Sequence, residues 1–355
     1  MTEPLAEAAA RKLAEWQSAF IPRRFLRNAH LQTLAGNFLP RRAMLPPAED
    51  ELVEVETARG STPCSRVLCQ GHWQPEAGRE TVLLLHGLEG SSDSQYVRGN
   101  AARFYAAGWN VVRMNMRNCG GTERESPTLY HSGLSGDVLA VMQHYQRTRD
   151  AQRWSLVGYS MGGNMVLKLA GELGEDAAPL LCAVAGVSPV VDLAPSADAL
   201  HEPANRIYEW KFLRGLLQRY AYKCALFPHL FDPERSRGVC SLREFDDRVM
   251  SPNCGFAGAN DYYYRAASAR VVDRIAIPTL VLHALDDPFI RMLPETRAAL
   301  LANPQVHLLE TERGGHCAFL APAAGYDGYW AERLIFNFLH AQSRDFLQAA
   351  QAETL

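Results

Sequence analysis

The chain has 355 residues, of which 47% are apolar, and its formal net charge at pH 7 is −3. This length supports a large buried core and exceeds that of a usual single domain, so we expect one core that carries an inserted piece. The small negative charge and the absence of blocks of like charge argue against nucleic acid or an anionic membrane as the main partner. A small neutral or weakly charged ligand fits better.

Eight cysteines are dispersed along the chain without a C-x-x-C pair. This is the pattern neither of a disulfide scaffold nor of a zinc site. We therefore expect reduced thiols and a cytoplasmic location.

The first twenty residues predict an amphipathic helix that packs on the body of the protein. Charges interrupt every apolar stretch there, so the segment is neither a secretory signal nor a membrane span, and no later segment is long enough to span a membrane. A peripheral membrane foot is the alternative. The apolar residues at helical spacing are Leu5, Ala9, Leu13, Trp16 and Phe20.

An irregular arm is expected up to about residue 50. Two short strands joined by a turn follow, at 52–60 and 64–71, and predict an antiparallel edge. Strands and helices then alternate, as in a parallel sheet covered on both faces. The expected order is a strand at 81–85, a helix at 93–107, a strand at 109–115, a helix at 134–148, a strand at 154–159 and a helix directly after it.

One more buried strand, at 181–189, precedes a long interruption of this alternation. The pattern resumes with a strand at 277–285, a helix at 294–302, a strand at 306–311 and a helix at 327–342. We predict an α/β fold with helices on both faces of a mostly parallel sheet and a helical cap inserted before the strand at 277–285. The expected parts are an N-terminal helix and arm (1–50), a core (51–192 and 266–345), the cap (193–265) and a C-terminal tail (346–355).

The stretch "GYSMGG" at 158–163 lies where a strand gives way to a helix. Gly158, Ser160 and Gly162 fit G-x-S-x-G, the nucleophile elbow, in which a sharp turn exposes the serine oxygen and leaves no room for bulk beside it. Ser160 is the candidate nucleophile.

A serine hydroxyl needs an adjacent base, which a buried carboxylate orients. The partners follow in the order acid, then histidine. "DDP" at 286–288 supplies Asp286 or Asp287, and "GGHC" at 314–317 supplies His316. Asp192, at the end of the preceding strand, is a third and weaker candidate for the acid.

Two backbone N–H groups are expected to form an oxyanion hole, those of Leu88 in "HGLEG" and of Met161 after the nucleophile. His86 is interpreted as an organiser of this loop, and Glu89 receives no role. Cys317 is assigned to packing, because a cysteine next in sequence to a histidine does not readily present its sulfur to that ring.

With these motifs, the chain resembles the α/β-hydrolase superfamily over roughly residues 50–345. "FIPRRFLRNAHLQTLAGNFLPRR" (20–42), "HGLEGSSDSQY", "FDDRVMSPNCGFAGANDYYYRAAS" and "LHALDDPF" resemble its YheT-like branch. The resemblance implies ester hydrolysis without metal or cofactor and a triad of Ser160, Asp287 and His316. Counting from Ala284, the small residue with which such a strand commonly ends, also favours Asp287.

The leading hypothesis is a serine carboxylic ester hydrolase that forms an acyl-enzyme on short- to medium-chain esters. One alternative is an acylglycerol or phospholipid lipase with the same site, and another is a catalytically silent ligand-binding protein. Transfer of the acyl group to an alcohol in place of water also stays open. The oligomeric state is not predicted. Most cap aromatics are expected to form the core of the cap and some to line an acyl pocket.

Overall fold

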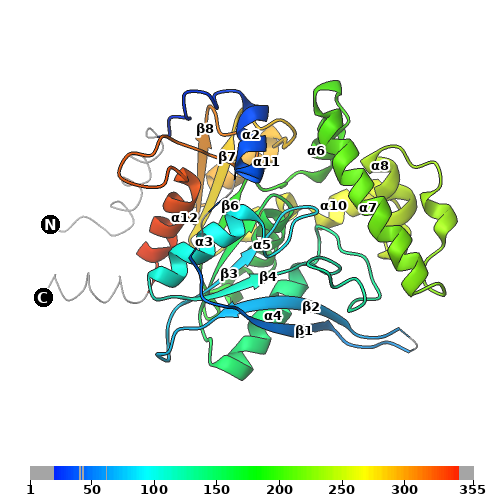
Figure 1. The fold of residues 1–355 in the computed structure, drawn as a ribbon, viewed down its shortest axis with the longest axis horizontal. Helices are drawn as coiled ribbons and strands as arrows, with labels where there is room; N and C mark the ends of the chain where they lie inside the picture. Colours follow the sequence, from blue (N-terminus) through cyan, green and yellow to red (C-terminus); the bar gives the residue numbers. More distant parts are fainter. Residues whose placement is uncertain (1–19, 40, 42–43, 61, 344–355) are drawn as a thin grey trace, which may run out of the picture.

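The computed structural model describes residues 20–39, 41, 44–60 and 62–343. At its centre lies an eight-stranded sheet with the order β1-β2-β4-β3-β5-β6-β7-β8 (Figure 1). β2 pairs antiparallel with β1 and β4, and the other neighbours are parallel, which confirms the predicted mostly parallel sheet and its antiparallel edge. The strands are β1 (Glu49–Glu56), β2 (Ser65–His72), β3 (Thr81–Leu85), β4 (Asn110–Met114), β5 (Trp154–Tyr159), β6 (Leu181–Val187), β7 (Thr279–Ala284) and β8 (Val306–Thr311).

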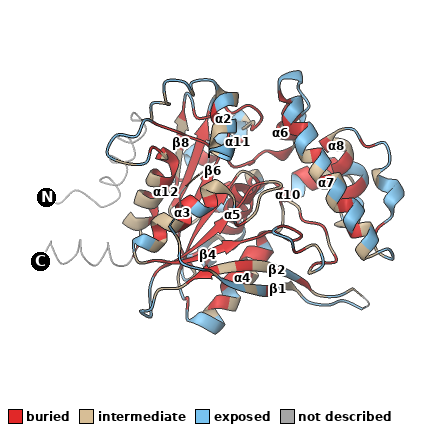
Figure 2. Ribbon diagram, viewed as in Figure 1, coloured by how far each residue is buried: buried red, intermediate tan, exposed pale blue. Residues whose placement is uncertain are grey.

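The central strands β3 to β7 are buried on both faces, as their red colour in Figure 2 shows. Successive side chains of a strand point to opposite faces, so Val82 and Leu84 of β3 join one hydrophobic core, while Leu83 and Leu85 join another. The first core lies under α3 (Gln95–Ala106) and α12 (Trp330–Ala341), and the second lies under α4 (Ser135–Arg149) and α5 (Met161–Leu173). This two-faced burial explains the continuous apolar runs from which the strands were predicted.

The chain between β6 and β7 is mostly helical and lies to one side of the sheet (Figure 1). We call residues 193–265 the cap segment; its division from the core is our interpretation of the fold. Its helices are α6 (Leu193–Leu200), α7 (Arg206–Leu226), α8 (Leu242–Phe245), α9 (Ser251–Asn253) and α10 (Ala259–Ala266), with a π-helical turn at Asp246–Met250. The remaining long helix, α11 (Pro294–Ala302), joins β7 to β8.

The arm before the sheet is not irregular throughout, because it contains the helix α2 (Ala29–Phe38). The Asn28 side chain caps this helix by accepting a hydrogen bond from Leu31 N. Two polar side chains of α2 are buried against the loop after β8: Gln32 Oε1 accepts from Leu320 N at 2.8 Å, and Thr33 Oγ1 accepts from His316 N at 2.8 Å. The motif "HLQT" therefore holds the loop that carries His316.

The helix predicted within the first twenty residues and the predicted tail at 346–355 lie outside the described residues, except for Phe20, which is not helical. Of the helices in the described part of the chain, none is long and apolar enough to cross a membrane.

Candidate active site

Ser160 stands between β5 and α5 with φ of 55° and ψ of −116°, a strained conformation for a residue with a side chain. The flanking glycines permit this turn. A Cβ on Gly158 would lie 2.2 Å from Gly162 O, and a Cβ on Gly162 would lie 2.4 Å from His86 O. The two glycines are thus required by the close approach of backbone to backbone, which is the geometry expected of a nucleophile elbow.

Asp287 follows β7, His316 follows β8, and the two side chains meet at the carboxyl ends of these strands. Asp287 Oδ2 lies 2.8 Å from His316 Nδ1, and Asp287 Oδ1 accepts hydrogen bonds from Phe289 N and Ile290 N. Burial alone would raise the pKa of Asp287, but the charge and hydrogen bond of His316 outweigh it, with help from Ile290 N–H, and lower this pKa. An ionised Asp287 fixes the proton of His316 on Nδ1 and leaves Nε2 as the acceptor.

The two rival carboxylates have other partners. Asp286 Oδ1 accepts a hydrogen bond from Gly315 N at 2.9 Å. Asp192 accepts a hydrogen bond from Leu293 N, just before α11, at 2.8 Å. It accepts another from Thr296 Oγ1, in the first turn of α11, at 2.9 Å. Of the three aspartates, only Asp287 is hydrogen-bonded to the histidine.

The expectation for Cys317 was wrong. Its backbone turns through a φ of 60°, and its Sγ lies 3.5 Å from His316 Nε2, the nitrogen that a nucleophile would use. Ser160 and His316 line the same pocket, but no hydrogen bond joins them among the described residues. Burial lowers the pKa of His316, yet its interactions with Cys317 and Asp287 outweigh burial and raise it to about 10. In this structure Cys317 Sγ, and not Ser160 Oγ, therefore contacts Nε2 of His316.

Leu88, in the loop after β3, and Met161, the first residue of α5, both line this pocket. The first N–H groups of a helix have no partner within the helix, so the Met161 N–H suits a developing negative charge. His86 braces the loop, because its Nε2 accepts from Met116 N and its Nδ1 lies 2.7 Å from Gly87 O. Burial lowers the pKa of His86 to about 4, which keeps the ring neutral and fits its predicted role as an organiser.

Glu89 also has a role that the sequence did not reveal. It has a φ of 56° and receives a 2.6 Å hydrogen bond from Tyr130 Oη. Arg219 of α7 contacts both of its carboxylate oxygens at 3.3 Å, and α7 makes room with Gly215, whose Cβ would lie 2.3 Å from Glu89 Oε2. The residue next to Leu88 is therefore tied to the cap segment.

A second cation of α7 strengthens this link. Lys223 is buried and donates hydrogen bonds to Asn118 Oδ1, Glu123 O and Ser126 O in the loop after β4. Burial lowers its pKa to about 7. Together with Arg219, one turn earlier, it fastens α7 to the core.

The pocket in front of Ser160 is a cavity of about 500 Å³ lined mostly by apolar side chains. Its walls come from α2, the cap segment and the loops after β3, β4, β7 and β8. The expectation that most cap aromatics form the core of the cap was wrong, because more of them line the pocket than pack outside it. The pocket is lined by Tyr208, Trp210, Phe212, Phe245, Tyr262 and Tyr263. Outside this lining, Tyr220, Phe227, Phe231 and Phe256 pack in the core, and Tyr222 and Tyr264 are exposed.

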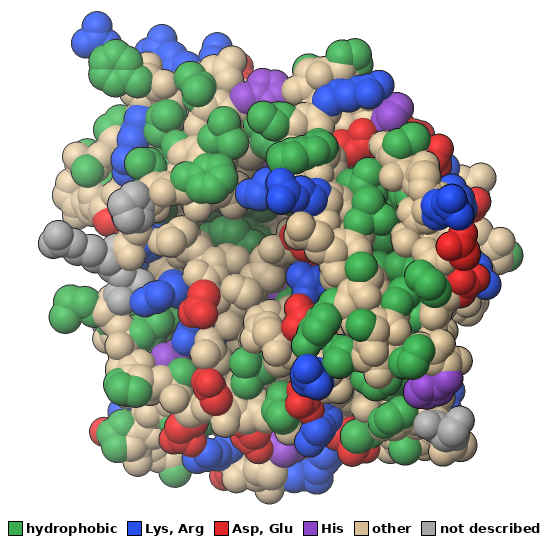
Figure 3. Space-filling view, turned by 45° about the vertical axis from the view of Figure 1, so that its right-hand side comes forward, with side chains coloured by type: hydrophobic (Ala, Val, Ile, Leu, Met, Phe, Trp, Pro, Cys, Tyr) green, Lys and Arg blue, Asp and Glu red, His purple; other side chains and the backbone are tan. Residues whose placement is uncertain are grey.

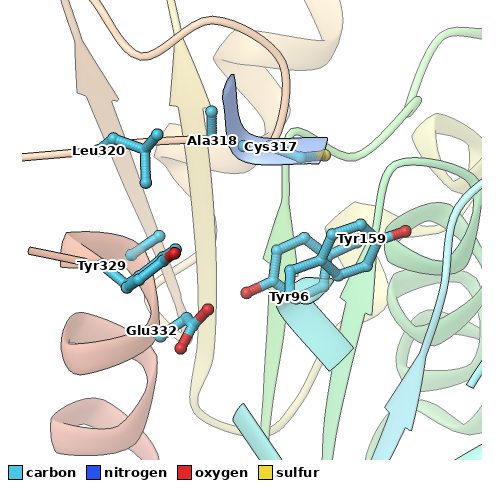
Figure 4. Close-up of a pocket in the computed structure, with 9 residues that line it drawn as sticks. Tyr96, Tyr159, Cys317, Ala318, Leu320, Tyr329 and Glu332 are labelled. Carbon is cyan, nitrogen blue, oxygen red and sulfur yellow. The ribbon is translucent and has the colours of Figure 1, made fainter. Parts of the chain in front are cut away.

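A second, much smaller cavity lies behind Cys317. Figure 4 shows the Glu332 carboxylate on one side of it and the stacked rings of Tyr96 and Tyr159 on the other. Its volume of about 10 Å³ is at the lower limit for holding one water molecule. Burial raises the pKa of Glu332 to about 8. This cavity is too small for a substrate.

Among the described residues, no group of three or more His, Cys, Asp or Glu side chains is placed to hold a metal ion.

Comparison with known proteins places this geometry in context. Residues 80–322 match the family described as alpha/beta hydrolase fold. The chain is 31% identical to YheT of Escherichia coli strain K12 over 324 residues, which is 90% of this chain and 92% of that protein. It is 28% identical to phospholipase ABHD3 of Homo sapiens, over 74% of this chain and 64% of that one, and 25% identical to monoacylglycerol lipase of Saccharomyces cerevisiae, over 70% and 56%.

Solved structures share the fold. An esterase of Pyrococcus furiosus superposes with a TM-score of 0.54 at 15% identity, covering 83% of this chain and 91% of the other. A 2,6-dihydroxy-pseudo-oxynicotine hydrolase gives 0.55 at 16% identity, covering 95% and 85%. At these identities the likeness concerns the fold alone.

Proposed function

Because this chain belongs to the α/β-hydrolase family, and within it to the YheT-like branch, we propose that it is a serine carboxylic ester hydrolase. Ser160 is the nucleophile, His316 the base and Asp287 the acid. The observation that carries the proposal is the 2.8 Å contact of His316 Nδ1 with Asp287 Oδ2, at the wall of the pocket that Ser160 also lines.

The reaction proceeds in two balanced halves. Ser160 Oγ attacks the ester carbonyl carbon while its proton passes to His316 Nε2, and the N–H groups of Leu88 and Met161 hold the resulting oxyanion. Collapse of this intermediate expels the alcohol, which takes the proton from His316, and leaves an acyl group on Ser160. Water, activated by His316, then releases the acid and regenerates the serine. The negative charge of Asp287 stabilises the imidazolium in both halves.

The pocket indicates the substrate class. Its apolar walls suit an acyl chain, and its volume of about 500 Å³ falls within the range of small-molecule sites. The same machinery would serve an acylglycerol or phospholipid lipase, which the names of the human and yeast relatives favour as the second candidate. A silent binding protein would need neither the base nor its acid.

Acyl length tests the substrate class. We expect water-soluble p-nitrophenyl esters of short and medium chains to be hydrolysed faster than emulsified long-chain triacylglycerols. The cap segment bounds the pocket, which suits an ester that enters from solution. A triacylglycerol emulsion is also uncharged and therefore does not attract basic side chains of the protein. Initial rates over a series of chain lengths, below and above the critical micelle concentration, provide the measurement. A sharp rise in rate as neutral micelles form would favour the lipase.

The pH dependence tests the contact between His316 and Cys317. The base must be neutral to accept the serine proton, and its raised pKa keeps it protonated to higher pH, so kcat/KM should rise with pH through a limb well above the ordinary histidine value of 6.5. Cys317→Ala removes one of the interactions that raise this pKa, and the limb should move to lower pH. Cys254→Ala, a cysteine outside the pocket lining, is the control and should leave the limb in place. An unchanged limb in Cys317→Ala would show that the contact of Cys317 with His316 does not raise the pKa of the base.

A further inference from the structure

The pocket opens between two helices. Most of its lining residues are buried or half-buried, and the exposed ones all belong to α2 or to the first turns of α7: Leu34, Asn37, Phe38, Ile207, Trp210 and Lys211. The helices face each other here, because Lys211 Nζ lies 4.8 Å from the centre of the Phe38 ring and His30 Nδ1 lies 3.1 Å from Tyr208 Oη. We call these six exposed residues the mouth.

The mouth exposes large apolar side chains to solvent. The exposed fractions are 66% for Phe38, 70% for Ile207 and 60% for Trp210, and Leu34 is 41% exposed. Leu31, one turn before Leu34, extends the same surface. Isolated exposed apolar residues are ordinary, but a contiguous group around the entrance to a site marks a binding surface. Figure 3 shows hydrophobic side chains bordering a hollow on this side of the molecule, with a basic side chain next to it.

The exposed charges on the two segments that carry the mouth have one sign, although the chain as a whole carries −3. Acids lie beyond these segments: Glu310 and Glu312 line a separate surface pocket with Arg27, and Glu202, before α7, pairs with Arg291. Residues 20–39 contain no acid, and the only acid in the first three turns of α7, Glu209, is buried and bonded to His201 Nδ1 and Leu242 N. The exposed cations of these two segments are Arg24, Arg27, Arg206, Lys211 and Arg214. None of them forms a salt bridge with another described residue.

We propose that the mouth docks on an anionic lipid surface, from which an acyl chain passes directly into the pocket. The apolar side chains enter the boundary between headgroups and acyl chains, and the cations face the anionic headgroups. A second copy of this chain is the poorer occupant, because a symmetric contact through the mouth would bring two groups of like charge together. Docking is a property beyond ester hydrolysis, and a binding assay tests it without turnover.

The test uses the full chain carrying Ser160→Ala, co-sedimented with vesicles of phosphatidylcholine alone or of equal parts phosphatidylcholine and phosphatidylglycerol. Binding should be ~10-fold or more stronger to the anionic vesicles and should weaken as salt is added. Adding Ile207→Asp or Lys211→Glu should each reduce binding ~10-fold. Leu301→Asp, an equally exposed apolar position on α11 outside the pocket lining, is the matched control and should bind as before. Circular dichroism verifies that each variant is folded.

Four outcomes would overturn the proposal. The first is equal or absent binding to the two vesicle types, and the second is unchanged binding of Ile207→Asp. The third is a dimer, seen in sedimentation velocity, that dissociates when Ile207→Asp is introduced. The fourth is binding that appears only after residues 1–19 are removed. The third would assign the mouth to a second copy, and the fourth would assign it to that N-terminal segment. Each outcome leaves the proposed hydrolysis untouched, since no variant is judged by its activity.

Discussion

Replacing Ser160 by alanine is expected to lower kcat/KM for a short p-nitrophenyl ester by ~10⁴-fold or more. The variant retains the pocket and the oxyanion donors but has no atom that can attack the carbonyl. Its fold should be intact, because the half-buried serine side chain has little packing to lose and the elbow is set by the flanking glycines.

Ser94→Ala is the matched control, since Ser94 lines the same pocket and its Oγ accepts a hydrogen bond from nearby Ser91 N. Its loss should stay within ~10-fold, as expected for one local hydrogen bond. If Ser160→Ala keeps a tenth of the wild-type activity, Ser160 is not the nucleophile.

Asp287→Asn is expected to reduce kcat by ~10⁴-fold, as an asparagine preserves the shape but neither stabilises the imidazolium nor selects the right tautomer of His316. The geometric reason is the 2.8 Å contact between Asp287 Oδ2 and His316 Nδ1. A rate of Asp287→Asn within tenfold of the wild type would show that this assignment is wrong.

The two neighbouring carboxylates provide controls of the same chemistry. Asp286→Asn removes the charge that accepts from Gly315 N, and Asp192→Asn weakens the bonds to the start of α11. Each should cost ~10-fold or less through a local hydrogen bond worth ~1 kcal/mol. Comparing kcat of the three variants therefore identifies the acid, because only one of them should show the large loss.

The sheet was predictable because its signal is local. Runs such as "TVLLL" are almost wholly apolar, since both faces of β3 are covered, and from β3 onward each strand is followed by a helix. The helix α2 was missed although Asn28, a favourable cap, precedes it. Its buried Gln32 and Thr33 interrupt the apolar pattern, and their partners lie almost three hundred residues later in the chain. A tertiary contact of this kind leaves no periodic trace in the sequence.

In the candidate site, too, the residues set by local sequence were predicted and those set by distant contacts were not. Ser160 and its glycines were found because the elbow is a local turn, and Asp287 was favoured because it stands three residues after Ala284, whose carbonyl accepts from Asp287 N. Glu89 was missed since its partner, Arg219, lies in the cap segment. Cys317 was misjudged because its backbone conformation is not visible in the sequence.

The proposed docking at the mouth rests on local charge, which the net charge of the chain does not describe. The net charge of −3 argued against an anionic surface, but it sums over the whole molecule. Only the structure brings α2 together with the first turns of α7, which carry the exposed cations Arg206, Lys211 and Arg214. A local field can thus oppose the overall charge.

The most direct measurement of the central claim is labelling with a fluorophosphonate followed by mass mapping of the modified peptide, because it requires a nucleophile, its activation and access to the pocket at once. The account predicts one phosphonylated site, Ser160, in the wild type and none in Ser160→Ala, with strongly slowed labelling in Asp287→Asn. A folded wild-type protein that stays unlabelled, or that carries the label on Cys317 or any other residue in place of Ser160, would contradict it.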